Sequence, residues 1–512
     1  MNEAVHPWSA AALCVATGTA ASIRRAVVLV TCTGVTFLYA MTVTVANVSL
    51  PQMQGTFAAS QDQIAWVVTL NIVATAVATP MSGWLVARLG RRRLMLFSVS
   101  GFALSSLACG LADSLEALVV FRILQGACGA PLVPVSQAII QDSYPRSSHG
   151  TAIAVFGMGS VLGPIMGPVL GGYLSEMYSW RWVFFMILPF TAAALLGVWL
   201  FLRDSEKPSP VRLDWTGFLT LAITVSCLQL MLDRGERADW FESLEIISYA
   251  AFTLVGLYIF IVHTFTTPTP FVTPSLFRDR NFSVGLIIVF VFGMLNFTPM
   301  TLVPPLLQNI AGYPDAIIGF ILGARGSGTL LGFTSMLYLS RFDPRKLIAI
   351  GFLLQAVAGW MMAQLDVNLS VADVFWPMFL QGLGVGLLWV PITLVTFSTL
   401  SPRHLNEGTA IYHLIRNIGS SIHISISIAL VIRMTRTNYA EIAPVLSPFN
   451  ELLSMQWVTG GFSIDSPGGL RAISGEVARQ ATMIGYIDSF YFFSITALLV
   501  LPLVLLISPR RY

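Results

Sequence analysis

Charged side chains are scarce in this chain of 512 residues. Asp, Glu, Lys and Arg make up 10% of the sequence, whereas a soluble domain carries about 25%. The hydrophobic share is 55%, which is more apolar surface than a soluble core could hide. The net charge of +3 is too small to indicate a nucleic-acid partner. The shortage of charge therefore excludes a soluble protein and indicates one that resides in a membrane.

The sequence also lacks the motifs of a soluble catalyst. Neither the phosphate-binding pattern GxxxxGK(S/T) nor the zinc-binding pattern HExxH occurs. The five cysteines show no CxxC spacing, so neither a metal site nor a disulfide framework is predicted. We therefore expect no enzymatic activity, no cofactor and no bound metal, and look for function inside the apolar segments.

Long apolar runs follow one another through the whole chain. A spanning helix needs about 20 mainly apolar residues, because the hydrocarbon core is about 30 Å thick and each helical residue rises about 1.5 Å. Fourteen runs meet this length and predict an all-α polytopic membrane protein. The expected helices are 26–50, 62–85, 94–112, 115–137, 149–174, 181–201, 213–232, 243–265, 282–307, 314–338, 346–364, 371–399, 407–433 and 486–508.

Basic residues are distributed unevenly between the loops. They concentrate in alternate loops, counted from the N-terminus, and include the run Arg91, Arg92 and Arg93. Loops that stay in the cytoplasm are enriched in Lys and Arg. Both termini are therefore predicted to be cytoplasmic.

The first six and last six expected helices show weak similarity to each other. FRILQG at 121–126 has a counterpart in MFLQG at 378–382, and ARLGRRRL at 87–94 has one in SRFDPRKL at 340–347. Halves related in this way are common in secondary transporters, whose substrate site lies between them. Chance resemblance between glycine-rich helices is the alternative explanation. If the similarity is real, the fourteen helices divide into six, two and six.

This division predicts four parts of the chain and one unusual loop. The expected parts are a cytoplasmic tail at 1–22, an N-terminal six-helix bundle at 23–205, two inserted helices at 206–270 and a C-terminal six-helix bundle at 271–512. The loop, at 434–485, is predicted to lie outside the cytoplasm. Within it, Leu470, Ile473, Val477 and Ala481 share one helical face, which predicts a helix lying on the membrane or on a partner. A solvated hairpin is the alternative.

Arg122 lies well inside the expected helix 115–137. A central arginine costs about 2.5 to 3.5 kcal/mol in a membrane, so it should face the bundle interior or a wet cavity. Gln125 and Gly126 follow on the same helical face. The second half has Met378 at the corresponding place, and this asymmetry favours a functional role for Arg122 over a purely architectural one.

Glycines recur at intervals of four in the expected helix 149–174. This spacing lines one face with bare backbone and allows a neighbouring helix to approach closely. It predicts a tight helix seam, either for packing alone or to prevent ion leakage. The seam residues are Gly159, Gly163, Pro164, Gly167, Pro168, Gly171 and Gly172.

Polar side chains interrupt the expected helix 407–433. His413, Arg416 and Asn417 fall on one face, and histidine is the side chain that titrates near neutral pH. These residues are predicted to lie on a substrate or proton pathway, although a buried histidine can also serve packing alone. Further candidates for polar groups of a cavity are Asn47, Asn71, Asn296, Arg325 and Gln381.

Several motifs in order resemble the major facilitator superfamily, and within it the fourteen-helix drug:proton antiporters. GWLVARLGRRR at 83–93 resembles the family's loop motif, with Gly83, Arg88, Gly90, Arg91 and Arg92. RILQGACGA at 122–130 resembles the helix 4 motif, and GSVLGPIMGPVLGG at 159–172 resembles the antiporter motif. LQLMLDRGERADWFESLEII at 228–247, followed by SPFN at 447–450 and a long external loop, is most similar to the EmrB type.

The resemblance implies an exporter of hydrophobic or amphipathic toxic compounds in the bacterial inner membrane. It implies proton entry as the driving force, and a periplasmic adaptor protein and an outer-membrane duct as partners. An uncoupled facilitator or importer is a second possibility, and a membrane sensor or scaffold without flux is a third. Gradient-driven flux would separate the three.

Two departures from the family pattern concern proton coupling. The loop motif usually has Asp where this chain has Ala87, and related antiporters commonly carry an acid in helix 1 where this chain has Thr42. No Asp or Glu is expected deep inside a helix. His413, and after it His423, are therefore the predicted proton carriers.

Overall fold

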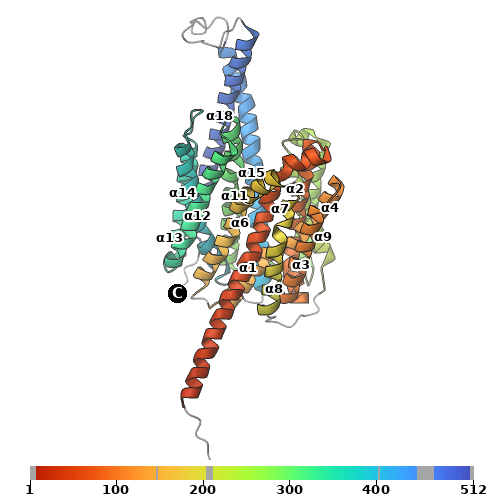
Figure 1. Cartoon of the computed structure of the whole chain (residues 1–512), viewed down its shortest axis with the longest axis vertical. Helices are drawn as coiled ribbons and strands as arrows, with labels where there is room; N and C mark the ends of the chain where they lie inside the picture. The colour runs from red at the N-terminus through yellow and green to blue at the C-terminus, as the bar shows by residue number, and fades with distance from the viewer. Residues whose placement is uncertain (1–6, 146–147, 203–211, 402–403, 447–465, 508–512) are drawn as a thin grey trace, which may run out of the picture.

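The computed structural model describes residues 7–145, 148–202, 212–401, 404–446 and 466–507. All regular elements in these ranges are helical, and they form one elongated bundle (Figure 1). Fourteen of the described helical segments are long and apolar enough to cross a membrane. The predicted all-α membrane fold and its number of spans are therefore confirmed.

The bounds of the helices are as follows. The first part contains α1 (Pro7–Phe57), α2 (Gln61–Leu89), α3 (Arg91–Gly110), α4 (Leu115–Gly129), α5 (Leu132–Ser143), α6 (His149–Met177), α7 (Trp182–Phe185) and α8 (Ile187–Phe201). The middle part contains α9 (Trp215–Arg234), η2 (Trp240–Glu242) and α10 (Leu244–Thr266). The last part contains η3 (Pro274–Arg278), α11 (Arg280–Asn309), α12 (Asp315–Leu339), α13 (Pro344–Met362), α14 (Val371–Phe397), α15 (Leu405–Ile442), η5 (Ala443–Val445), α18 (Pro467–Leu499) and α19 (Leu501–Val504).

Short polar residues set where several helices begin. Ser60 and Ser370 each form a capping box, in which the serine hydroxyl accepts from a backbone N–H three residues later. Gly90 separates α2 from α3 with φ of 82°, a conformation that favours glycine. The expected helix 115–137 is divided into α4 and α5 around Pro131, because proline has no N–H to continue the helical ladder.

The two halves meet mainly along two pairs of helices, with further contacts of α5 with α15 and of α6 with α14. α2 packs on α15 and α6 packs on α12. Near the end of the bundle that holds Arg91, which we call the basic end, Arg91 donates from Nε to Asn406 Oδ1 at 3.1 Å. A Cβ atom built on Gly150 of α6 would lie 2.7 Å from Ser340 Cβ at the end of α12. The halves are therefore in close contact at the basic end.

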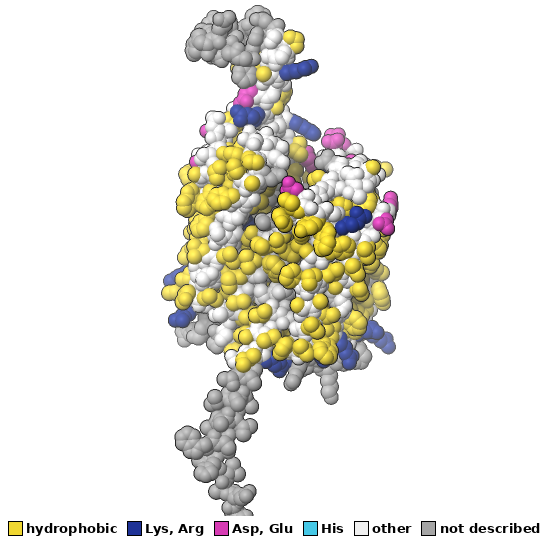
Figure 2. Space-filling view, viewed as in Figure 1, with side chains coloured by type: hydrophobic (Ala, Val, Ile, Leu, Met, Phe, Trp, Pro, Cys, Tyr) yellow, Lys and Arg dark blue, Asp and Glu magenta, His cyan; other side chains and the backbone are white. Residues whose placement is uncertain are grey.

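The surface divides into an apolar belt and two charged rims. Figure 2 shows hydrophobic side chains around the middle of the bundle, Lys and Arg along its lower rim and at its upper end, and most of the visible Asp and Glu toward the upper end. This distribution suits a bundle that crosses a bilayer, because charged groups stay at the aqueous boundaries.

The inserted helix α9 lies beside the seam between α2 and α15. Leu221 and Val225 of α9 form a small apolar cluster with Ala76 of α2 and Leu414 of α15. Ser425 of α15 donates to the Leu232 carbonyl at 2.8 Å. The insertion therefore contacts both halves.

Helices occupy both ends of the 434–485 segment that was expected to be a loop. α15 continues to Ile442 and α18 begins at Pro467, and Figure 1 shows this pair rising beyond the rest of the bundle. Val477 and Ala481 are buried, whereas Leu470 is 50% exposed. The helix expected to lie on the membrane surface is thus the first part of α18. We call α15 from residue 434 and α18 up to residue 480 the hairpin.

The predicted tail is helical in its described part. α1 begins at Pro7, and the part of this helix that is apolar enough to cross a membrane begins at Ser22, so residues 7–21 extend the helix beyond the span. Residues 1–6 lie outside the described part, as does the SPFN motif at 447–450.

Candidate functional site

Arg122 of α4 is enclosed within the first half. Its side chain is almost fully buried, and Nε donates to the Val67 carbonyl of α2 at 3.2 Å. Nη1 donates to Gln125 Oε1 at 2.5 Å, and Gln125 donates in turn to Ser106 at 2.7 Å. Asn71 of α2 donates to the Arg122 carbonyl at 2.7 Å. The structure thus brings Arg122, Gln125 and Asn71 together.

A second buried arginine holds a similar place in the other half. Gly126 of α4 packs on the backbone carbonyl of Asn71, and Gly382 of α14 packs in the same way on that of Arg325 in α12. Arg325 donates from Nε to Gln381 Oε1 at 2.7 Å and from Nη2 to Asn296 Oδ1 at 3.0 Å. The arginine of the second half therefore comes from α12 rather than α14.

The position of Arg325 removes the asymmetry between the halves that the comparison of Arg122 with Met378 suggested. Met378 does stand at the position equivalent to Arg122, but each half nevertheless buries one arginine beside a glutamine. The difference between Arg122 and Met378 consequently gives no reason to prefer a functional role. What remains specific to Arg122 is its Nη2, a buried donor that has no hydrogen-bond partner among the described residues.

His413 of α15 makes a direct contact between the halves. Its Nε2 lies 2.7 Å from Oε1 of Gln137 in α5, and both side chains are buried. In this arrangement the ring nitrogen donates and the amide oxygen accepts. The contact joins helices 276 residues apart in the chain.

Arg416 lies one turn further along α15. Its guanidinium carbon is 5.0 Å from the centre of the Trp389 ring in α14, a cation–π distance. Nη2 donates to Asn417 Oδ1 at 3.1 Å. The Trp389 and His413 rings are 6.3 Å apart. We call Gln137, Trp389, His413, Arg416 and Asn417 the central group.

The remaining predicted pathway residues are divided between these places. Gln381 is buried beside Arg325, whereas Asn47 of α1 is exposed and outside all three networks. His423 is buried at the α11 contact, where its Nδ1 lies 2.8 Å from Thr298 Oγ1 and its ring stacks on Phe492. The central group therefore includes only three of the predicted residues.

Sequence reasoning missed two members of the central group. Gln137 stands in the apolar run LVPVSQAII, and an amide in such a run is a usable signal. Trp389 gives no comparable signal, because aromatic residues occur throughout the membrane helices.

The glycines of α6 form the predicted close seam, and their neighbour is α1. Gly159 and Gly167 pack on Thr33 and Thr44. A Cβ atom built on Gly163 would lie 2.6 Å from the Phe37 carbonyl oxygen, so a larger side chain there would force the helices apart. The seam lies within the first half.

The loop motif spreads its contacts over several helices. Arg91 pairs with Asp142 of α5 at 2.7 Å, and Arg92 donates to the Trp199 carbonyl of α8 at 2.7 Å. Arg88 lies over the Trp84 ring at 5.2 Å. A Cβ atom built on Gly83 would lie 3.1 Å from the Glu407 Cα of α15. Through Arg91 and Gly83 the motif contacts the second half.

Acids are better represented inside the helices than the sequence predicted. Because α18 begins at Pro467, Asp488 lies well inside the last spanning helix, not near its start. The Thr42 hydroxyl, at the place of the family acid, donates to the Leu38 carbonyl of its own helix at 2.7 Å. Thr42 is therefore bonded locally, and an aliphatic hydroxyl does not exchange a proton near neutral pH as a carboxylate or histidine can.

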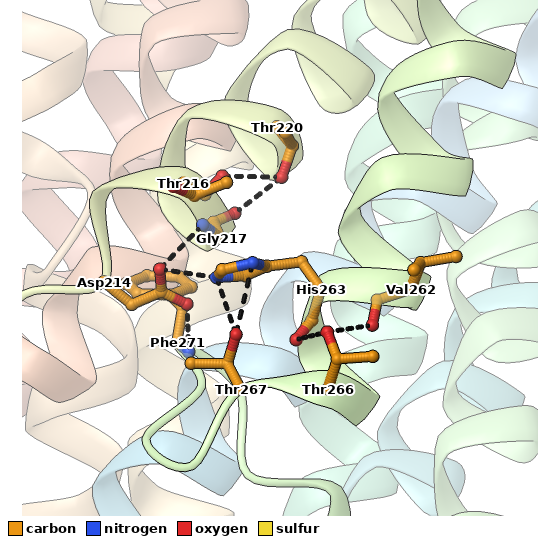
Figure 3. Close-up of polar contacts among 9 residues, drawn as sticks. All are labelled: Asp214, Thr216, Gly217, Thr220, Val262, His263, Thr266, Thr267 and Phe271. Atoms are coloured by element: carbon orange, nitrogen blue, oxygen red, sulfur yellow. Dashed lines mark hydrogen bonds and ion pairs between the residues drawn. The ribbon is translucent and has the colours of Figure 1, made fainter.

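The linker that follows α10, residues 267–273, is held at the basic end by hydrogen bonds. Asp214 caps α9 by accepting from the Gly217 N–H, accepts from the Phe271 N–H at 3.0 Å and contacts His263 Nε2 at 2.8 Å (Figure 3). Burial raises the pKa of Asp214, but these hydrogen bonds outweigh burial and lower it below its ordinary 3.8. Thr273 then donates through its N–H to Glu407 of α15 at 2.6 Å.

Known proteins resemble this chain along most of its length. Residues 32–423 match the family model of the Major Facilitator Superfamily. The chain is 32% identical to the multidrug export protein EmrB of Escherichia coli K12, over 89% of both chains. It is 33% identical to the fatty acid resistance protein FarB of Neisseria gonorrhoeae, over 92% of this chain and 94% of the relative. The proton:xylose symporter XylE has the same fold, with a TM-score of 0.62, 12% identity and coverage of 94% and 95%.

Proposed function

The chain belongs to the Major Facilitator Superfamily, and from this premise we propose that it exports hydrophobic or amphipathic toxic compounds, driven by proton entry. The observation that carries the proposal is the match over 89% of both chains to a protein named for multidrug export. The apolar environment of the central group, between the two halves, suits compounds that partition into membranes.

The contacts between the halves suggest how transport proceeds. In secondary transporters the halves rock about a central site and expose it to one side at a time. Here the contacts of Arg91 with Asn406 and of Gly150 with Ser340 close the basic end. Opening that end requires these contacts to separate. The proposed role of the loop motif is to maintain them until binding of substrate or a proton makes the open conformation more stable.

We assign the proton to His413, as the sequence predicted. Its neutral ring bridges to Gln137 while the halves are in contact. An added proton would place a second positive charge one turn from Arg416 in a buried contact, which is unfavourable. When the halves separate and water enters, the charged ring becomes acceptable. Protonation and opening are coupled in this proposal.

The proposed location is the bacterial inner membrane, with both termini in the cytoplasm. The run Arg91, Arg92 and Arg93 at the basic end supports this orientation. The hairpin then projects into the periplasm. We propose that it binds a periplasmic adaptor protein, which connects the exporter to an outer-membrane duct.

Cells that lack other exporters provide the first test. Expression of the chain should lower the steady-state accumulation of a hydrophobic dye and raise resistance to amphipathic toxic compounds. Equal accumulation with and without expression, at confirmed membrane levels, would exclude export and favour a sensor or scaffold. Accumulation that rises with expression would instead favour an importer.

A further inference from the structure

A groove lies beside α11 and α15 in the second half. It has a volume of about 420 Å³ and is lined by side chains of η3, α11 and α15, namely Phe277, Ser283, Leu286, Ile287, Phe290 and Ile415. Five of the six side chains are apolar, and the Ser283 hydroxyl already donates to the Phe277 carbonyl at 2.7 Å. The lining therefore suits a hydrocarbon chain.

The groove is close to the basic end of the bundle. Asp279, just before α11, accepts from the hydroxyl of Thr399 in the α14–α15 connection at 2.6 Å, and α15 begins at the basic end. Ile287 lies seven residues inside the span that begins at Arg280, which is about two helical turns. The groove thus occupies the part of the bilayer next to the basic end.

The margin of the groove faces the surrounding lipid. Phe277 and Ile287 are 48% and 49% exposed. At this end the halves are in contact through Arg91 and Asn406, so an exposed side chain at this depth faces the bilayer and not a space between the halves. Acyl chains are the medium that surrounds such side chains.

Two exposed arginines stand at the end of the groove nearest the aqueous boundary. Arg280 precedes Ser283 by three residues and Ile287 by seven, so the three share one side of α11. Arg278 directly follows Phe277. Among the described residues, neither arginine belongs to an ion pair. Both can therefore interact with an anionic group at the membrane surface.

The carboxylate between these arginines has another role. Asp279 caps α11, because its Oδ1 accepts from the Phe282 N–H at 3.0 Å, and the same oxygen accepts from Thr399. With one carboxylate and two guanidinium groups, residues 278–280 keep a positive charge. Basic groups at the ends of membrane helices attract anionic lipid headgroups.

We propose that this groove binds an anionic phospholipid, with one acyl chain along Ile287 and Phe290 and the phosphate at Arg280 and Arg278. An apolar groove that ends at two cations matches the tail and the anionic headgroup of such a lipid, whereas the helix of a second copy would bring no anion to the arginines. Guanidinium groups bind phosphate through paired N–H donors. The lipid is a ligand from the bilayer and not a transported compound, so the proposal goes beyond export and does not depend on it.

Native mass spectrometry of the purified full-length chain in detergent tests the proposal. The probes are dioleoyl phosphatidylglycerol, which is anionic, and dioleoyl phosphatidylcholine, which is zwitterionic and has the same tails. Titration gives a dissociation constant for the first lipid that binds. We expect phosphatidylglycerol to bind more tightly by about fivefold or more, which corresponds to the roughly 1 kcal/mol of one basic residue near an anionic lipid. Equal affinities would overturn the anionic preference.

Two substitutions and two matched controls assign the lipid to the groove. Arg280→Gln should weaken only phosphatidylglycerol, by about fivefold, and Ile287→Trp, which fills the groove, should weaken both lipids. The controls Lys346→Gln and Ile350→Trp change exposed residues at similar positions of α13 that do not line the groove, and should bind as wild type.

The variants also distinguish other occupants of the groove. If Ile287→Trp does not fold, the surface exchange Arg280→Gln decides alone. Wild-type affinity for phosphatidylglycerol in the folded groove variants would overturn the site. A dimer that Ile287→Trp abolishes and that added lipid leaves intact would assign the groove to a second copy of the chain, and would also overturn the proposal.

Discussion

Arginine is the charged residue that this bundle buries in its interior. Arg122 and Arg325 are each satisfied mainly by backbone carbonyls and a glutamine oxygen, within one half. Arg416 is different, because it stacks on Trp389 beside a contact between the halves. At the residue scale, Arg122 and Arg325 therefore organise their own halves, and Arg416 is the one placed to respond when the halves move.

Substitution of Arg122 should impair transport because the hydrogen bonds to Val67 and Gln125 are lost. Arg122→Lys keeps the charge but loses the planar fork that reaches Val67 and Gln125 together. Loss of these charge-assisted hydrogen bonds should lower initial transport rates by about tenfold or more, with normal membrane insertion. Initial efflux rates at matched protein levels measure this. Wild-type efflux in Arg122→Ala would contradict this prediction and show that transport does not require the hydrogen bonds of Arg122.

Substitution of His413 should separate binding from proton coupling. His413→Gln keeps a hydrogen-bond donor toward Gln137 but cannot titrate. We expect substrate to bind to this variant with wild-type affinity, while pH-driven transport falls to the level of empty vesicles. His423→Gln is the matched comparison and should keep pH-driven transport, because His423, the second predicted carrier, bonds to Thr298 within one half. If only His423→Gln loses pH-driven transport, His423 is the carrier; if both variants keep it, Asp488 becomes the next candidate.

Sequence spacing predicted the contacts that one helix makes with itself. Gln125 follows Arg122 by three residues, and their hydrogen bond follows from helical geometry. The contact of His413 with Gln137 could not be predicted in this way, because it depends on which helices the two halves bring together. The same is true of Arg325 and Gln381, which belong to different helices.

At the element scale, hydropathy located the spanning helices but not the hairpin. Residues beyond 434 are too polar to be recognised as part of a membrane helix. The two helices nevertheless continue because they pair: Gly485 packs on the Val431 carbonyl, and the hydroxyls of Tyr439 and Ser474 lie 2.9 Å apart. Such pairing stabilises helices outside the membrane and is invisible to a hydropathy scale.

The exposed face of the hairpin should bind the adaptor. Leu470 is half-exposed near the start of α18, and burial of a leucine contributes about 1.5 to 3 kcal/mol. Leu470→Asp should weaken adaptor binding by about tenfold or more and remove resistance in cells, while transport in vesicles stays normal. Phe241→Asp, an exposed apolar residue in the α9–α10 connection, is the control. Unchanged co-purification of the adaptor with Leu470→Asp would contradict docking at this face.

The cap at Asp214 should stabilise the inserted helices in a pH-dependent manner. Asp214→Ala removes the cap of α9 and its contact with His263, at a cost of about 0.5 to 2 kcal/mol. Because the folded-state pKa lies below the ordinary 3.8, the charged carboxylate stabilises the fold above that pH and loses its effect as pH falls through the lower value. The difference in thermal midpoint between wild type and variant should narrow as pH falls below about 4. A constant difference down to pH 3 would show that the charge contributes nothing.

In the whole molecule, the inserted helix α9 and the contacts at the basic end both lie along the seam between α2 and α15. α9 contacts α2 and α15, and its linker reaches Glu407 at the start of α15. The contacts of Arg91 and Gly83 reach α15 at the same end. Any rocking of the halves must therefore rearrange the linker as well as the loop motif, so the insertion belongs to the moving parts of the exporter.

Imposed pH differences across a vesicle membrane distinguish proton-driven export from passive equilibration. The purified chain is reconstituted in vesicles, the electrical potential is clamped, and uptake of octanoate, chloramphenicol and ethidium is followed with the lumen acidic. Inside-out protein should concentrate at least one probe in the lumen, in proportion to the pH difference, and His413→Gln should not. Uptake that only equilibrates the probe, with the same rate and extent whether or not a pH difference is present, would contradict proton-driven export.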